Sequence, residues 1–135
     1  VVEAEEAVSL TLPPREWELV TVSPVQREEL PAAAAASGAE EEVHWAPLGL
    51  TNMMNGGGAI SSSSLIPGAF GRSTSAFTAL KATGDFAAYC TPRPRSVRVD
   101  GAPHESYTYD EATGLLTVAL GRSAAAAEVA VTWRR

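Results

Sequence analysis

The stretch ESYTYDEATGLLTVAL, residues 105–120, predicts two strands joined by a tight turn. Its flanking runs, 105–110 and 115–120, are rich in residues that favour strands, and DEATG at 110–114 separates them. Asp tolerates turn conformations and Gly adopts positive φ without steric strain, so the interruption has a physical cause. We therefore expect a hairpin here.

The same pattern continues through the second half of the chain. Further β-rich runs occupy 74–82, 85–91, 96–100 and 127–133. Turn signals separate the runs, at Thr83-Gly84, 92–94, Asp100-Gly101 and 121–123. Short strands at about ten-residue spacing predict an all-β antiparallel sandwich with Greek-key-like connections. A length of 135 residues suits a single domain, 1–135.

The first half is less regular. Residues 7–12 and 16–23 alternate apolar and polar side chains, which predicts two paired strands around a turn at Pro13-Pro14. Residues 43–50 predict a buried strand interrupted by Pro47. Two variable loops are expected, an Ala/Glu-rich one at 27–42, where a frayed helical turn is an alternative, and a Gly/Ser-rich one at 55–73.

Charge and cysteine content narrow the possible functions. Ten Lys and Arg against 16 Asp and Glu give a net charge of −6, which disfavours nucleic acid and anionic membranes as partners. One cysteine, Cys90, allows no disulfide within the chain and no Cys-based metal motif. The chain has neither an apolar run of about 20 residues nor a signal-peptide layout. Because it starts at Val1, we expect it to be processed or part of a longer polypeptide.

The glycine and serine tracts offer two possible sites. Gly56–Gly58 could form a phosphate loop, but neither a following Lys nor a helix is predicted, so a backbone turn is favoured. Ser61–Ser64 lack the Gly-x-Ser-x-Gly pattern of a hydrolase nucleophile and are expected in a solvated loop.

The titratable residues favour structural roles. His44 and His104 are far apart in sequence, so a metal site is not expected, and Cys90 alternates with Phe86 on a predicted buried face. Each carboxylate considered for glycosidase chemistry falls in a turn or on a solvated sheet face. These carboxylates are Asp85, Asp100, Asp110, Glu16, Glu18, Glu105 and Glu111. We predict no catalytic, cofactor-binding or metal residue, and no cofactor.

Three tryptophans remain as a possible sugar-binding surface. Trp17, Trp45 and Trp133 each lie in an apolar run, and Trp133 continues the alternation of Val129 and Val131. We therefore expect the three indoles in the core, with a carbohydrate-stacking platform as the alternative.

Three blocks of the sequence resemble a known family. WAPLGLTNMMNGGGAI (45–60) is similar to F-A-P-I-G-L-x-N-M-x-N-S-G-G-A-[IV], found near the C-terminus of plant raffinose synthases and seed-imbibition proteins (alkaline α-galactosidases) of glycoside hydrolase family 36. REWELVTVSPVQ (15–26) and residues 84–120 resemble the flanking blocks in the same order. The departures are Trp45 for Phe, Gly56 for Ser, Cys90-Thr91 for Ser-Ser, and a longer alanine loop.

The resemblance implies a role as well as a fold. Family members carry a (β/α)8 barrel with two catalytic aspartates, followed by a β-sandwich, and they transfer galactose from galactinol to sucrose or hydrolyse α-galactosides such as raffinose. A barrel needs about 250 residues, so this chain is expected to be the C-terminal accessory sandwich without it. Such a domain would pack on and stabilise the barrel, would not be an enzyme alone, and would meet galactinol, sucrose or raffinose only through the barrel.

Several alternatives remain open at this stage. A free-standing carbohydrate-binding sandwich and a protein-interaction sandwich compete with the accessory-domain hypothesis. YTYDEATGL at 107–115 slightly favours the seed-imbibition branch, without excluding a synthase. The resemblance implies a plant protein of the cytoplasm or plastid.

Overall fold

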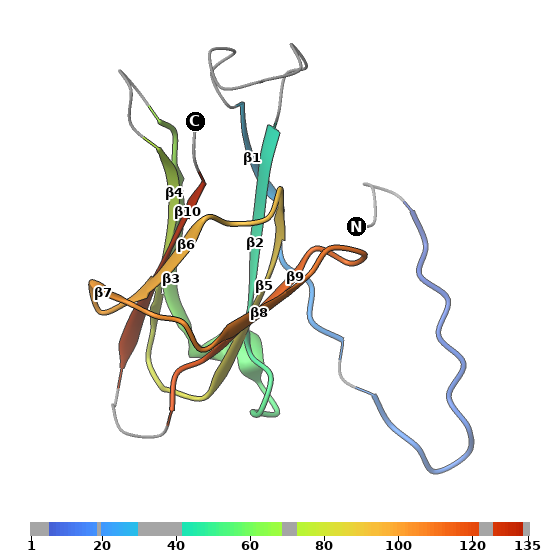
Figure 1. Ribbon diagram of the computed structural model, residues 1–135. Coiled ribbons are helices and arrows are strands. Elements are labelled where there is room, and N and C mark those ends of the chain that lie inside the picture. The colour runs from blue at the N-terminus through green and yellow to red at the C-terminus, as the bar shows by residue number, and fades with distance from the viewer. Residues whose placement is uncertain (1–5, 19, 30–41, 69–72, 122–125, 134–135) are drawn as a thin grey trace.

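Two antiparallel sheets pack face to face in the computed structural model of the protein (Figure 1). The structure describes residues 6–18, 20–29, 42–68, 73–121 and 126–133. The predicted all-β sandwich is therefore confirmed.

The first sheet contains the strands with the longest apolar runs. Its spatial order is β1-β2-β5-β9-β8, and all neighbours are antiparallel. The strands are β1 (Gln26–Glu29), β2 (Glu42–Leu50), β5 (Asp85–Thr91), β9 (Leu115–Ala119) and β8 (Tyr107–Asp110).

The second sheet has the order β3-β4-β10-β6-β7, again antiparallel throughout. It comprises β3 (Ile60–Ile66), β4 (Thr74–Leu80), β10 (Ala127–Trp133), β6 (Ser96–Val99) and β7 (Ala102–Pro103). A short 3-10 helix, η2 (Gly56–Ala59), leads from β2 of the first sheet to β3 of the second. The predicted strands of the second half are confirmed, with ends that shift by up to two residues.

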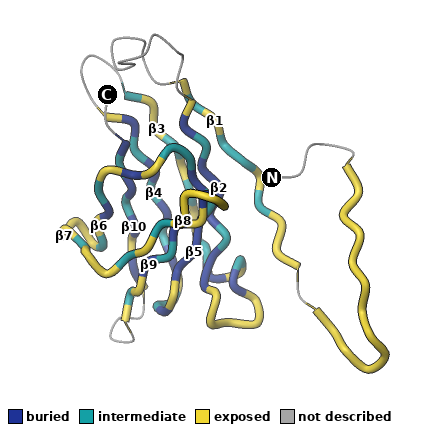
Figure 2. Tube along the Cα trace, turned by 45° about the vertical axis from the view of Figure 1, so that its right-hand side comes forward, coloured by how far each residue is buried: buried dark blue, intermediate teal, exposed yellow. Residues whose placement is uncertain are grey.

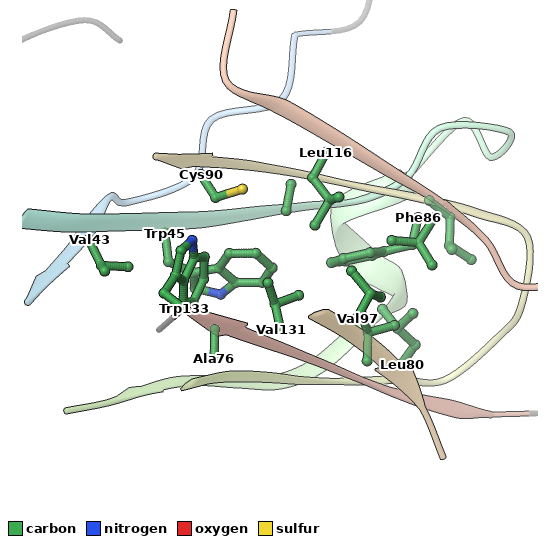
Figure 3. Close-up of a cluster of buried hydrophobic side chains, with 14 of the residues drawn as sticks. Val43, Trp45, Ala76, Leu80, Phe86, Cys90, Val97, Leu116, Val131 and Trp133 are labelled. Carbon is green, nitrogen blue, oxygen red and sulfur yellow. The ribbon is translucent and has the colours of Figure 1, made fainter. Parts of the chain in front are cut away.

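Period-two alternation builds the core between the sheets. Along β4 and β10, every second residue is buried, so each strand turns one face inward. Side chains from both sheets then meet in one apolar cluster (Figure 3). Its buried members are Val43, Trp45, Leu50, Ala59, Ala76, Leu80, Phe86, Ala88, Cys90, Val97, Leu116, Val118, Val129, Val131 and Trp133.

Trp45 and Trp133 meet at the centre of this cluster. Trp45 comes from β2 of the first sheet and Trp133 from β10 of the second. Their ring centroids lie 5.8 Å apart at 70°, an edge-to-face arrangement, and Phe86 lies 6.4 Å from Trp45. Edge-to-face contact directs the positive edge of one ring at the negative face of the other. The expected core positions of these two tryptophans are confirmed.

Both buried indole N–H groups have acceptors. Trp45 Nε1 donates to Ser63 Oγ at 3.1 Å, and Ser63 Oγ lies 3.1 Å from Thr78 Oγ1. Trp133 Nε1 donates to the carbonyl of Pro92 at 2.7 Å. The first of these bonds joins β2 to β3, so it links the two sheets directly.

The predicted loops at 27–42 and 55–73 are partly wrong. The serine tract forms β3, paired with β4, because Ser63 turns inward to the Trp45 N–H while its neighbours face solvent. Similarly, Gln26–Glu29 forms edge strand β1 along β2. The alanine-rich part of the first loop, residues 69–72 of the second, and 122–123 of the last predicted turn lie outside the described residues.

Pro47 does not interrupt β2, contrary to the sequence-based expectation. The strand runs through it with a register shift between Pro47 and Gly49. A proline lacks the N–H that a ladder needs, but a strand accepts one beside a bulge or where the missing donor points away from its paired neighbour. Pro47 remains opposite Ala88 of β5.

The predicted strand pair 7–12 and 16–23 is also wrong in the described residues. This segment, here called the arm (residues 6–25 without residue 19), is outside both sheets and stands off the sandwich as a largely exposed chain (Figure 2). Glu16 N donates to Pro13 O at 3.1 Å and Arg15 has φ of 70°, which with Pro14 before it is typical of a type II turn. Such turns splay the two strands instead of closing a tight hairpin.

Removing the acceptor of the Trp45 N–H tests the link between the sheets. Ser63→Ala should lower the free energy of unfolding by about 1–3 kcal/mol, because a buried donor is left without its partner. Ser64→Ala, at an exposed position of the same strand, is the matched control and should change it by less than about 0.5 kcal/mol. Urea unfolding measures both.

A second background isolates the hydrogen bond. The Trp45→Phe variant has no indole N–H. In that background, Ser63→Ala should lower the free energy of unfolding by about 1 kcal/mol less than it does in the original chain, as measured in a double-mutant cycle. An unchanged loss would contradict the role assigned to Ser63.

Candidate functional site

The described residues hold no group of three or more His, Cys, Asp and Glu side chains that could bind a metal ion. The two histidines are bonded separately. His44 Nε2 lies 2.6 Å from Glu42 Oε2 on β2, and His104 Nε2 lies 2.9 Å from the carbonyl oxygen of Ala119. The structure therefore does not bring the two histidines together.

The three aspartates lie at strand ends or in turns, as predicted, and Asp85 is the first residue of β5. Asp100 forms the two-residue β6–β7 turn with Gly101, and its carboxylate accepts from Glu128 N at 2.8 Å. Asp110 accepts from Thr113 Oγ1 at 2.8 Å and from Ala112 N at 2.9 Å. These two bonds favour the carboxylate, so they hold the pKa of Asp110 below its usual value.

The four glutamates of interest for glycosidase chemistry lie on the arm and around β8. Glu16 and Glu18 are exposed on the arm, whereas Glu105 and Glu111 lie before and after β8. Glu111 pairs with Arg93 at 3.4 Å across an exposed surface. No two of these glutamates therefore share a built site in the described part of the chain.

Cys90 is a core residue. It is fully buried on β5 and belongs to the central apolar cluster, as predicted. Burial disfavours the thiolate and raises the pKa of the thiol from 9.0 to about 12. A thiol held in this form is a poor nucleophile.

The TNMMN loop, residues 51–55 between β2 and η2, is held by its polar residues. Thr51 donates through both N and Oγ1 to the carbonyl of Asp85, at 2.8 and 3.1 Å. Asn52 accepts from Asp85 N at 3.4 Å, and Asn55 Oδ1 accepts from Gly58 N at 3.2 Å at the start of η2. The loop is thereby tied to β5 on one side and to η2 on the other.

Glycines let the loop fold back against β2. Gly49 has φ of 99°, and a Cβ there would lie 2.0 Å from the carbonyl oxygen of Gly56. A Cβ on Gly56 would lie 2.3 Å from Leu50 O. The glycine triplet therefore serves the backbone, as predicted, although it forms a 3-10 turn and not a bare loop.

All five residues of the TNMMN loop are exposed, and the two methionines are its apolar members. Met53 is 44% exposed and Met54 is 73% exposed. Because the threonine and asparagines are used in internal hydrogen bonds, the loop presents two flexible apolar side chains on a fixed base. Methionine surfaces of this kind adapt readily to a partner.

The arm carries the larger apolar surface. Its exposed large hydrophobic residues are Val8, Leu10, Leu12, Trp17, Val20 and Val22. Trp17 is 72% exposed, so its predicted core position is wrong. The alternation of apolar residues predicted a half-buried strand, but in the described residues these apolar side chains are exposed.

A groove of about 600 Å³ lies between the arm and the first sheet. Val8, Val20 and Val22 line it from the arm, and Ala46 and Tyr89 line it from the first sheet. These two sheet residues alternate with the core residues Trp45 and Cys90, so they lie on the outer face of the sheet. We call this feature the arm groove; its full lining is Glu6, Val8, Val20, Thr21, Val22, Ser23, Val25, Ala46, Leu48 and Tyr89.

The arrangement suits binding of an apolar partner. Trp45 and Trp133 are buried, so they cannot form the sugar-stacking platform considered from the sequence. The exposed apolar residues of the arm and of the TNMMN loop instead form the candidate interaction surface. Within the described ranges, the structure contains no helix with the length and apolar character of a membrane span.

Alanine at Gly49 tests the close approach of the loop to β2. Gly49→Ala should lower the free energy of unfolding by at least about 3 kcal/mol, since it combines a positive φ with a backbone clash. Gly101→Ala is the matched control because Gly101 also has positive φ, 79°, but has no atom within 4 Å of a Cβ. Gly101→Ala should lower the free energy of unfolding by only about 1–2 kcal/mol. An equal decrease in the two variants would contradict the packing assigned to Gly49.

The burial of Cys90 predicts both reactivity and pH dependence. At pH 8 the folded chain should not react with a thiol reagent, whereas the urea-unfolded chain should. Because the folded pKa is raised, the contribution of Cys90 to stability is complete below pH 9.0 and is lost as pH rises toward 12. Rapid labelling of the folded chain, measured by mass spectrometry, would contradict this placement.

Comparison with known sequences places this sequence in a family. The sequence model described as raffinose synthase or seed imbibition protein Sip1 matches residues 1–120. Galactinol–sucrose galactosyltransferase of Oryza sativa subsp. japonica is 34% identical over 114 residues, covering 84% of this chain and 13% of the relative. Probable galactinol–sucrose galactosyltransferase 5 of Arabidopsis thaliana is 33% identical over 116 residues, covering 82% and 12%.

The matched region therefore covers most of this chain but only a small part of each relative. The chain spans about one eighth of the length of these two proteins. On the combined strength of the family match and the two relatives, this chain belongs to the raffinose synthase and seed imbibition protein family.

Proposed function

We propose that this chain is the C-terminal β-sandwich domain of a protein similar to galactinol–sucrose galactosyltransferase or alkaline α-galactosidase. In this proposal it packs on a (β/α)8 barrel, stabilises it, and is not catalytic alone. Galactinol, sucrose and raffinose are then bound by the barrel. The observation that carries the proposal is the exposed apolar surface of the arm and the TNMMN loop.

This surface is unusual for a free domain. Val22 is 89% exposed, and five other large apolar residues of the arm are at least half exposed. Monomeric soluble proteins rarely expose extended apolar patches, and larger ones mark interaction sites. Covering these side chains would give the domain a favourable free energy of association with its partner.

The roles of the polar residues also support an accessory function. Catalysis on a glycosidic bond requires two carboxyl groups facing one sugar. In the described residues, Asp100 and Asp110 are engaged in turns and Glu111 pairs with Arg93. The two relatives named as galactosyltransferases are about eight times as long as the region they share with this chain.

Exchange of the matching region tests the proposal. Three proteins are incubated with galactinol and sucrose. They are the chain alone, a rice galactinol–sucrose galactosyltransferase that lacks the matched region, and a chimera of that rice protein that carries this chain in place of the matched region. We expect raffinose from the chimera and none from the other two. Met53→Ser with Met54→Ser should reduce raffinose formation by the chimera, whereas Ile66→Ser, an exposed apolar control on β3, should not.

Two results would contradict the proposal. Raffinose formation by the chain alone would place catalysis in the sandwich. A chimera that is folded by circular dichroism but inactive would show that this chain cannot serve as the family's accessory domain.

A further inference from the structure

Two parts of the arm have the sequence pattern of strands but lie in neither sheet. The first limb is residues 6–12 and the second limb is residues 20–25. Apolar side chains recur at every second position, Val8, Leu10 and Leu12 in one and Val20 and Val22 in the other. A strand with this alternation buries one face, yet all five residues are at least half exposed.

A proline pair explains why the second limb leaves the edge of the first sheet. The β1–β2 ladder includes Gln26 opposite Trp45. Continuing this antiparallel register by two residues sets Pro24 opposite Pro47. Neither proline can donate a ladder hydrogen bond, so pairing stops and the second limb separates from β2.

The splayed turn at Pro13–Glu16 keeps the first limb away from the second. The arm groove is lined by Val8 of the first limb, by Val20 and Val22 of the second limb, and by Ala46 and Tyr89 of the first sheet. In the described residues, the backbone of both limbs therefore belongs to neither sheet and lies beside the apolar residues that line the groove.

We infer that the arm groove receives an extended β-strand from the part of the family polypeptide that lies outside this chain. The strand pairs through its backbone with the limbs and places alternate apolar side chains against Val20, Val22 and Tyr89. This inference rests on the proposed function and names the structural element by which the partner docks.

Two observations favour this occupant. The family match begins at residue 1 and runs through the whole arm, so the arm belongs to the sequence shared by the family. The relatives hold about seven eighths of their length outside the shared region, which leaves ample chain to supply a strand. Strand addition uses main-chain hydrogen bonds for affinity and alternate side-chain pockets for specificity, and the groove offers both.

Hydrogen exchange measured by mass spectrometry tests the backbone pairing. Amides of residues 7–12 and 20–23 are compared in the chain alone and in the rice chimera described above. We expect exchange at these amides to be at least about tenfold slower in the chimera, because ladder hydrogen bonds protect them. The exposed turn at 110–114 should exchange equally in both proteins.

Paired variants separate the groove from the rest of the surface. Val20→Lys with Val22→Lys should abolish the added protection in the chimera while leaving the melting temperature of the chain alone unchanged, since both side chains are exposed there. Ser64→Lys with Ile66→Lys, at exposed positions of β3 in the second sheet, should leave the protection intact.

The outcomes distinguish this inference from the proposed function. An active chimera whose limbs exchange as fast as in the chain alone would overturn strand addition and leave the proposed function standing. An inactive chimera whose limbs are protected from exchange would overturn the proposed function and leave strand addition standing. Protected limbs in the chain alone, with a dimeric mass in solution, would identify a second copy as the occupant and overturn the inference.

Discussion

The contact between Trp45 and Trp133 fixes how the two sheets face each other. Each indole is buried and carries one N–H, so each requires an acceptor inside the sandwich. For Trp45 the acceptor is Ser63 of β3, and for Trp133 it is the carbonyl of Pro92 at the end of β5. The edge-to-face geometry and these two bonds therefore set both the spacing of the sheets and the inward orientation of two segments that look like loops in the sequence.

This dependence explains which strands could be predicted. From β4 onward, alternation and turn residues are local signals, and they located every strand but the two-residue β7, within about two residues of its observed ends. β3 could not be predicted because its serines have no apolar alternation; Ser63 faces inward through a tertiary hydrogen bond to Trp45. β1 was missed for a similar reason, since it is a short charged edge strand defined by pairing with β2.

In the candidate site, too, features set by local backbone geometry could be predicted, whereas features that depend on distant contacts could not. The glycine triplet was predicted as a backbone feature, and the clash that a Cβ would cause at Gly49 gives the physical reason. The resemblance to the family was found in the sequence around the TNMMN loop, where Gly49 and Gly56 allow the close approach of the backbone. The arm was predicted as paired strands because alternation is typical of a strand with one covered face, but the pattern does not reveal whether that face is covered. Trp17 was placed in the core for that reason and is exposed.

The central claim is that Trp45 and Trp133 close the sandwich while the described residues of the arm lie in neither sheet. A nuclear Overhauser spectrum of the chain in solution tests it most directly. We expect contacts between the rings of Trp45 and Trp133, cross-strand Hα contacts between β2 and β5, and none between residues 7–12 and 16–23. Cross-strand contacts between those two segments, or the absence of contacts between the two indoles, would contradict it.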